Sequence, residues 1–174
     1  ITGGAGFLGA RLARTLLAQG TLAGRSIAQL VLADQVAAPA DLCADARVQA
    51  RTGPLLAACE ALRDEAFDGV FHLASAVSGE CEADFDLGMR SNYEATRALL
   101  EACRALGTRP VLVFASSLAV FGNVPGFALP EVIEDNTLPT PQSSYGIQKF
   151  IGEQLVADFG RKGLRLAGAV ILVD

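Results

Sequence analysis

The sequence is poor in the residues that build metal centres. It holds one histidine, one methionine and no tryptophan. His72 lies inside the apolar run GVFHLAS, with no second metal-ligand candidate nearby. Zinc sites need several His, Cys or carboxylate ligands held together. We therefore expect no metal site, and we expect His72 to be a core residue rather than a ligand or a catalytic base.

Closely spaced cysteine pairs are also absent. The four cysteines are far apart in the sequence and form no Cys-x-x-Cys motif: Cys43, Cys59, Cys81 and Cys103. Cytosolic proteins keep their thiols reduced, and free cysteines are commonly buried. The pattern predicts reduced, mostly buried thiols in a cytoplasmic protein rather than a disulfide framework.

An excess of positive charge and a long hydrophobic run are missing as well. The formal net charge is −5, which offers no basic surface for nucleic acid. No uninterrupted run of about 18 apolar residues suggests a membrane span. Because the chain opens at Ile1 without a methionine, we expect residues to precede it, and these could include a targeting segment.

What is present is an alternation of strand and helix patterns along 174 residues, half of them apolar. Apolar periodicity predicts the following elements: a strand end at ITGG, helices over 7–20, 54–67, 82–106 and 143–160, and strands over 27–34, near Val48, and over 69–75, 110–117 and 164–174. Residues 122–142, with four prolines and two glycines, read as a loop. Such alternation is typical of one α/β domain with a parallel sheet covered on both faces.

The glycines of TGGAGFLG lie between a strand end and a helix start. Gly3, Gly6 and Gly9 allow a tight turn and let the helix N-terminus approach a pyrophosphate. The next strand ends in Asp34, where a carboxylate can accept hydrogen bonds from an adenosine ribose. The context favours dinucleotide binding. A glycine-rich turn without a ligand and a simple strand-end charge are the alternatives.

A tyrosine stands one helical turn before a lysine in SSYGIQKF. At positions i and i+4, Tyr145 and Lys149 share one face of a helix. A nearby positive charge favours the phenolate, which is the form that acts as a general base. Taken alone, the spacing also fits a solvated helix face.

Four pieces in this order, TGGAGFLG, FHLAS, FASSLAVFG and YGIQK, resemble the extended short-chain dehydrogenase/reductase superfamily and its NAD-dependent epimerase/dehydratase family. The resemblance implies a Rossmann-type, doubly wound domain over residues 1–174, with an incomplete first strand. It also implies a C-terminal substrate-binding lobe that is largely absent from this chain. The segment from His72 to Gly107 is most similar to members that oxidise a small sugar acid such as D-erythronate.

The resemblance also implies roles for individual residues. NAD is the implied cofactor, and its implied contacts are Gly3, Gly6, Phe7, Leu8, Gly9, Asp34, Leu73, Ala74, Ser75, Asn92, Tyr145 and Lys149. The implied catalytic group is Ser117, Tyr145, Lys149 and Asn92, and the implied substrate contacts are Ser75, Ser117 and Tyr145. Ser116 is expected to face away from the site. The sugar acid's carboxylate could also meet Ser143 and Ser144, although solvated loop serines fit equally well.

Some positions depart from the family pattern. Family dehydratases carry an Asp-Glu pair after the active hydroxyl residue, where this chain has Leu118 and Ala119. Elimination of water is therefore poorly supported. An acid that often contacts adenine is replaced by Gly53 and Pro54, and the ending AGAVILVD does not match the Arg-Pro-Gly continuation of relatives.

Three functions fit these patterns. The first is an NAD-dependent oxidoreductase of carbohydrate metabolism that oxidises a secondary alcohol of a small sugar acid by hydride transfer. The second is an NAD-dependent nucleotide-sugar epimerase, and the third is a non-catalytic dinucleotide-binding protein. The resemblance further implies a homodimer formed through residues 82–106 and 144–160, with Leu99, Leu100, Phe150 and Leu155 as candidate contacts.

Overall fold

The first residues of the chain form the middle of a parallel sheet. In the computed structural model, which describes residues 1–62 and 65–172, Thr2 bridges Ala33 on one side and His72 on the other. Strands β3 (Leu30–Asp34) and β4 (Val48–Thr52) continue the sheet on the Ala33 side. On the other side lie β5 (Gly69–His72), β6 (Val111–Ser117) and β7 (Arg165–Leu172). The order β4–β3–Thr2–β5–β6–β7 is that of a doubly wound Rossmann sheet.

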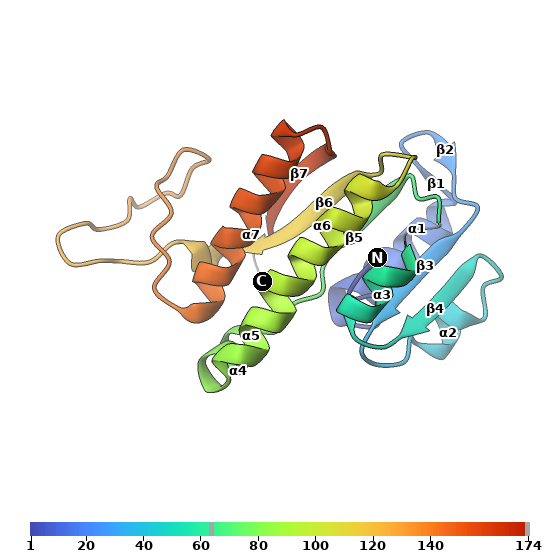
Figure 1. The fold of residues 1–174 in the computed structure, drawn as a ribbon, viewed down its shortest axis with the longest axis horizontal. Helices are drawn as coiled ribbons and strands as arrows, with labels where there is room; N and C mark the ends of the chain where they lie inside the picture. The colour runs from blue at the N-terminus through green and yellow to red at the C-terminus, as the bar shows by residue number, and fades with distance from the viewer. Residues whose placement is uncertain (63–64, 173–174) are drawn as a thin grey trace.

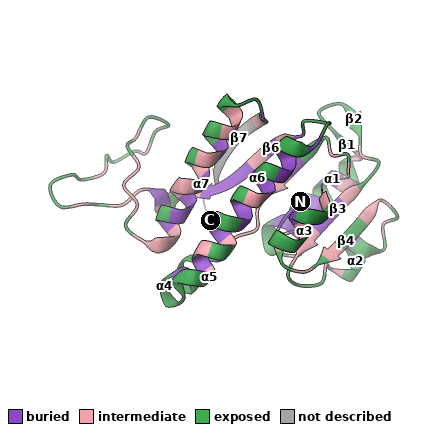
Figure 2. Ribbon diagram, in the orientation of Figure 1, coloured by how far each residue is buried: buried purple, intermediate pink, exposed green. Residues whose placement is uncertain are grey.

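Helices cover both faces of this sheet (Figure 1). On the near face of the view lie α3 (Leu55–Ala61), α6 (Ala95–Ala105) and α7 (Ser144–Arg161), and α1 (Phe7–Gln19) lies behind β3. The short α2 (Ala40–Cys43) precedes β4. Figure 2 shows that the helix faces turned toward the sheet are buried, whereas the outer faces are exposed. The predicted α/β fold with helices on both faces is confirmed.

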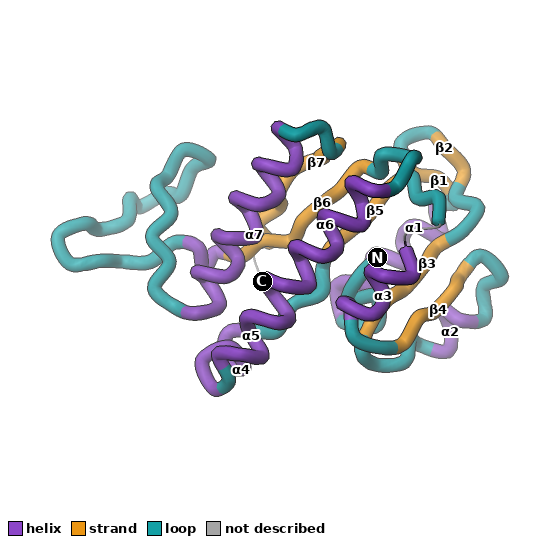
Figure 3. The backbone as a smooth tube through the Cα atoms, viewed as in Figure 1, coloured by secondary structure: helices purple, strands orange, loops and turns teal. Residues whose placement is uncertain are grey.

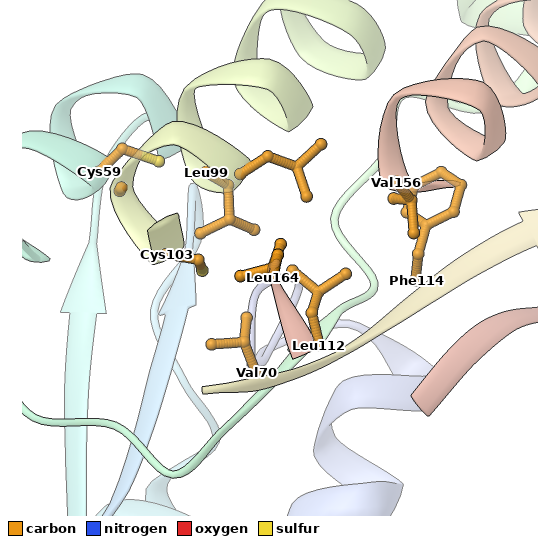
Figure 4. Packing of buried hydrophobic residues seen from close by; sticks show 10 residues of the cluster. Cys59, Val70, Leu99, Cys103, Leu112, Phe114, Val156 and Leu164 are labelled. Carbon is orange, nitrogen blue, oxygen red and sulfur yellow. The ribbon is translucent and has the colours of Figure 1, made fainter. Parts of the chain in front are cut away.

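Each face has its own hydrophobic core. The larger cluster joins α3, α6 and α7 to β5 and β6, and Figure 4 shows its side chains packed between the helices and the strands. Its members are Cys59, Val70, Leu99, Leu100, Ala102, Cys103, Leu112, Phe114, Val156 and Leu164. On the opposite face α1, α2 and β3 bury Ala10, Ala13, Leu32 and Leu42. Burial of such side chains is the main driving force for packing these layers.

The predicted helix over 82–106 is broken. A separate helix, α4 (Ser78–Ala83), ends at Asp84, whose backbone is extended with φ −138° and ψ 95°. The Asp84 carboxylate accepts a hydrogen bond from the Leu87 N–H at 2.8 Å and so caps α5 (Phe85–Gly88). The chain then continues through a π-helix, η2 (Met89–Glu94), into α6. The prediction was wrong because it gave this aspartate no capping role.

Other predicted boundaries shift by smaller amounts. The helix predicted over 54–67 is α-helical only at Leu55–Ala61, and its residues 63–64 lie outside the described residues, as do 173–174 of the last predicted strand. A two-stranded antiparallel hairpin, β1 (Thr21–Leu22) with β2 (Arg25–Ser26), was not predicted. The loop between the 3-10 turn η3 (Leu118–Val120) and α7 is confirmed, and Figure 3 shows it extending away from the sheet.

The buried residues bear on two further predictions. Leu99 and Leu100 are each 1% exposed, so they belong to the monomer core and cannot supply the dimer contact predicted for them. Three of the four free cysteines are buried and only Cys43 is exposed, which confirms mostly buried thiols. Among the described residues, none of the helices combines the length and apolar composition that crossing a membrane requires.

Helix α7 packs closely against the end of β6 because Gly146 has no side chain. A Cβ atom added there would collide with the backbone carbonyl of Ala119 in η3. The contact is with backbone rather than with a flexible side chain, so the helix or the turn would have to move. Gly146 therefore sets how closely the start of α7 approaches the turn that follows Ser117.

We predict that Gly146→Ala lowers the free energy of unfolding by about 1–3 kcal/mol, the usual cost of overpacking. Urea denaturation measures this loss. The control is Gly79→Ala in α4, where an added Cβ atom meets nothing within 4 Å. Alanine is the better helix former, so this control should not lose stability. Equal behaviour of the two variants would contradict the close approach at Gly146.

Candidate active site

The glycine turn is a backbone cradle at the start of α1. Gly3 has φ +69°, a conformation that side-chain-bearing residues rarely adopt. A Cβ atom on Gly9 would collide with the Gly3 carbonyl, so glycine allows the helix to begin directly against the turn. Gly6 is the N-cap residue, and no side chain caps the helix. The first-turn N–H groups and the helix dipole therefore suit a diphosphate.

A cleft of about 780 Å³ opens beside this turn. It lies at the carboxyl ends of the strands, where the order of the sheet reverses, which is the usual ligand position in this fold. The predicted cofactor contacts in the glycine turn, at the end of β3 and after β5 all line this cleft: Gly3, Gly6, Phe7, Leu8, Gly9, Asp34, Leu73, Ala74 and Ser75. Gly53 and Pro54 line it too, followed by Leu55 and Leu56. This end of the cleft therefore offers apolar contact where the family pattern often has an acid.

Asp34 is held in place by the glycine turn. Its Oδ2 atom accepts a hydrogen bond from the Ala5 N–H at 2.9 Å. Its Oδ1 atom accepts a longer one from the Val36 N–H at 3.3 Å. A carboxylate anchored in this way at the end of β3 keeps lone pairs that can accept hydrogen bonds from ribose hydroxyls.

Three of the four predicted catalytic residues lie on β6 and α7, which pack against each other, whereas Asn92 lies on η2. Ser117 is the last residue of β6, and its Oγ atom accepts a hydrogen bond from the Ala119 N–H at 3.2 Å. Tyr145 lies in the first turn of α7, and the Lys149 Nζ atom is 5.7 Å from the centre of its ring. The expected shared helix face is thus observed. Ser116 instead donates its hydroxyl proton to the Glu153 carboxylate, so it does turn away from Ser117.

Lys149 is buried and held by backbone. It is 4% exposed, its Nζ atom donates to the Ala115 carbonyl oxygen at 2.9 Å, and it lies 5.1 Å from the centre of the Phe114 ring. Burial lowers the pKa of Lys149 from 10.5 to about 8, because a charged amine loses its hydration. Near neutral pH the lysine remains mostly an ammonium, which is the form that can attract an anionic phenolate or donate a hydrogen bond to a ribose hydroxyl oxygen.

The side chains of Asn92 and Ser75 are hydrogen-bonded to each other. The Asn92 Oδ1 atom accepts hydrogen bonds from the Ala76 N–H at 2.8 Å and the Ser75 hydroxyl at 3.0 Å. Its Nδ2 atom donates to the Ala76 carbonyl oxygen and to the Gln148 Oε1 atom. Asn92 is 3% exposed and does not line the cleft, although Ser75 does. The side chain predicted as part of the catalytic group is thus occupied in holding the cleft wall.

His72 is a core residue, as predicted. Its Nδ1 and Nε2 atoms lie 2.7 Å from the Thr2 hydroxyl and 2.8 Å from the Thr96 hydroxyl. Burial, together with the nearby Lys149 charge, lowers the pKa of His72 to about 3. The ring is therefore neutral at neutral pH. Within the described part of the chain, no three His, Cys, Asp or Glu side chains gather as a metal site would require.

Two residues near the site were not predicted. Arg90, on η2, is the one basic side chain among the described residues that line the cleft. Gln148, within the YGIQK motif, contacts Asn92 from α7. No local pattern marks either one, because their partners are remote in the sequence and are brought close only by the fold. Of the loop serines, Ser143 caps α7 by accepting from the Gly146 N–H at 3.0 Å.

Comparison with known proteins places this geometry in a family. Residues 1–172 match the model of the NAD dependent epimerase/dehydratase family. D-erythronate dehydrogenases of Cupriavidus necator and Haemophilus influenzae are 53% and 44% identical to the chain over 171 and 169 residues. Each match covers 94% of this chain and 50% of the relative. A nucleoside-diphosphate-sugar epimerase structure from Agrobacterium tumefaciens superposes with a TM-score of 0.85 at 39% identity, covering 98% of this chain and 51% of that one.

The chain therefore belongs to the NAD-dependent epimerase/dehydratase family. Membership confirms the predicted family resemblance and NAD as the predicted cofactor. The similarity to two D-erythronate dehydrogenases agrees with the sugar-acid reading of the segment from His72 to Gly107. The chain spans about half the length of the curated relatives it matches.

The buried Lys149 predicts a pH-dependent stability. Its pKa of about 8 lies below the ordinary value of 10.5, so the unfolded chain binds the proton more tightly than the folded one. The penalty for burying the ammonium is full below about pH 8, is relieved as the pH rises toward 10.5, and is absent above that value. Lys149 should therefore make the free energy of unfolding rise by about 3 kcal/mol across this window.

Urea denaturation between pH 7 and 10 measures the rise. Lys149→Met should remove it, whereas Lys162→Met should preserve it, because Lys162 is exposed at the end of α7. A rise of the same size in the Lys149→Met variant would show that Lys149 is not the source of the pH dependence.

Proposed function

We propose that the protein is an NAD-dependent oxidoreductase that oxidises a secondary alcohol of a small sugar acid such as D-erythronate. The observation that carries the proposal is the Lys149 ammonium, held by the Ala115 carbonyl beneath Tyr145 at the end of the strand that bears Ser117. Ser117, Tyr145 and Lys149 do not line the cleft that has the features of a dinucleotide site. Hydrogen bonds through Asn92 nevertheless link Ala76 of the cleft wall to Gln148 on the helix of Tyr145 and Lys149. The names of the two curated relatives support the dehydrogenase class and the sugar-acid substrate.

The residues present fit NAD. The absence of a side chain on Gly9 lets α1 begin directly against the turn, so that its first-turn N–H groups can meet a diphosphate, and Asp34 presents a carboxylate to a ribose. Arg90 supplies a positive charge in the same cleft that can face the diphosphate. When bound, NAD supplies the hydride acceptor for oxidation of an alcohol.

The chain's own residues would carry the proton and orient the alcohol. Tyr145 takes the proton of the substrate hydroxyl as general base, and the Lys149 ammonium stabilises the anionic form of the tyrosine that does so. Ser117 donates a hydrogen bond to the same oxygen as it becomes a carbonyl, which aligns it and stabilises the developing charge. Leu118 and Ala119 carry no acid or base, so elimination of water is not supported.

A nucleotide-sugar epimerase is the second candidate, favoured by the similarity to the Agrobacterium tumefaciens structure. It would use the same tyrosine but retain its cofactor. A non-catalytic dinucleotide-binding role is disfavoured, because binding alone needs no acid–base tyrosine beside a buried lysine. The substrate-binding lobe expected after residue 174, a cytoplasmic location and a homodimer remain predictions. For the dimer, Phe150 is a half-buried candidate contact on α7, whereas Leu155 packs against the core.

Adding D-erythronate and NAD to the full-length protein should produce free NADH, which is followed by its absorbance. Tyr145→Phe should bind NAD as before and lower turnover by roughly 100- to 10,000-fold, the contribution of general acid–base catalysis. Tyr93→Phe, at the chain's other tyrosine, is the control and should remain active. Retained NAD with no net NADH would instead indicate the epimerase, and normal turnover of Tyr145→Phe would refute the tyrosine's role.

Asp34 predicts a preference for NAD over NADP. The 2′-phosphate of NADP would bring negative charge against the Asp34 carboxylate, and no arginine or lysine follows within residues 35–42 to neutralise it. The expected penalty is on the order of 10- to 100-fold in affinity. Calorimetric titration of both cofactors at fixed salt measures the preference.

Asp34→Ala should narrow the difference between the two cofactors. Asp41→Ala should not, because Asp41 is exposed, pairs with Arg14 and lies outside the cleft lining. Equal affinities of the unmutated protein for NAD and NADP would remove Asp34 from the ribose site.

A further inference from the structure

In the protein core, the Gln148 side-chain amide has a hydrogen-bond partner for its oxygen but none, among the described residues, for its nitrogen. It lies on α7, between Tyr145 and Lys149, and is 1% exposed. Its Oε1 atom accepts a hydrogen bond from Asn92 Nδ2 at 2.9 Å. Its Nε2 atom is buried and finds no hydrogen-bond partner among the residues the structure describes. Buried donors are nearly always paired, so this one calls for a physical explanation.

The orientation of this amide follows from a backbone N–H that can only donate. The Ala76 N–H requires the oxygen of Asn92, not its nitrogen, at 2.8 Å. Asn92 must then direct Nδ2 toward Gln148, which must answer with Oε1. Reversing Gln148 would set two NH₂ groups against each other. The hydrogen bonds that start at Ala76 in the cleft wall therefore fix the orientation of Gln148 and leave its Nε2 atom unpaired.

The surrounding helices leave the amide no other position. Gly88 of α5 borders it, and a Cβ atom there would lie 2.6 Å from Nε2 and 2.9 Å from Oε1. The same Cβ atom would lie 3.1 Å from Cys81 Sγ, which also accepts from Asn92 Nδ2 at 3.3 Å. The glutamine is thus enclosed by α4, α5 and η2 while it is anchored on the helix of Tyr145.

The contact joins the two halves of the site. Asn92 holds the backbone of Ala76 from both its N–H and its carbonyl, and it binds the Ser75 hydroxyl. Ser75 and Ala76 line the cleft, whereas Gln148 is one residue from Lys149. A shift of the Asn92 amide would therefore move the cleft wall relative to the tyrosine and the lysine.

We propose that Gln148 is a positioning residue that fixes the Asn92 amide and thereby sets the cleft wall against Tyr145 and Lys149. It touches neither substrate nor cofactor and acts through Asn92. The unpaired donor destabilises the folded state. An apolar side chain of similar length would fit the space without that penalty but would release the asparagine. The proposal rests on the proposed binding of NAD in the cleft.

Gln148→Met in the full-length protein separates stability from function. Its melting temperature should stay equal or rise, because the unpaired donor is gone, while the dissociation constant for NAD rises about tenfold and turnover falls. Gln154→Met, at an exposed glutamine of the same helix, is the matched control and should change neither. A residue that served packing alone would lower the melting temperature without this loss. Unchanged NAD affinity and turnover in Gln148→Met would overturn the proposal.

A second variant keeps the inference testable if methionine disturbs packing. Gln148→Glu retains an oxygen for Asn92 Nδ2 and should bind NAD within about threefold of the unmutated protein. In a double-mutant cycle with Asn92→Leu, Gln148→Met should add little further loss, because both act through one contact. Additive losses would contradict this pathway. Calorimetry distinguishes a failure of this inference from a failure of the proposed function. An unmutated protein that binds no NAD would refute the proposed function itself.

Discussion

The close packing of α7 on the end of β6 is the constraint on which the site depends. Gly146 lets the start of the helix meet the turn after Ser117, and the Lys149 ammonium closes the contact on the Ala115 carbonyl. Ser116 of β6 donates a hydrogen bond to Glu153, which lies one turn beyond Lys149 on α7. These contacts join the strand that bears the serine to the helix that bears the tyrosine and the lysine. The relative position of the three residues is therefore a property of the core, not of a flexible loop.

A second constraint shapes the cleft in which we propose that NAD binds. The first residues of the chain lie in the middle of the sheet, between β3 and β5, and the glycine turn follows them directly. Asp34 ends β3 and lines the cleft, as do Ser75 and Ala76, which follow β5. The parallel sheet thus brings together segments remote in the sequence, because the carboxyl ends of all its strands share one edge. The Asn92–Gln148 pair then fastens this edge to α7.

The local patterns in the sequence predicted the elements of this arrangement well. Gly3, Gly6 and Gly9 marked the turn, and at Gly3 and Gly9 an added side chain would collide with backbone. The one-turn spacing of Tyr145 and Lys149 predicted their shared face. The break at Asp84 could not be separated from a continuing helix, because the flanking residues keep helical periodicity and the aspartate's capping bond is visible only in three dimensions.

Contacts between residues remote in the sequence could not be predicted either, because they too are visible only in three dimensions. Asn92 was assigned a catalytic role from family resemblance, whereas its amide is occupied by Ala76, Ser75 and Gln148. Leu99 and Leu100 were candidate dimer contacts, because an apolar helix stripe fits an interface as well as a core. Their burial against β5 and β6 shows that they belong to the core. No pattern within one segment specifies which face of a helix meets the sheet and which meets another molecule.

A crystal structure of the full-length protein with NAD bound tests most directly whether α7 and β6 present the catalytic group to the cofactor. The nicotinamide ribose should lie within hydrogen-bonding distance, about 3 Å, of the Lys149 Nζ atom or the Tyr145 hydroxyl, with the nicotinamide ring facing Ser117. A nicotinamide directed away from α7, with Lys149 bonded only to Ala115, would contradict the assignment of these residues to hydride transfer.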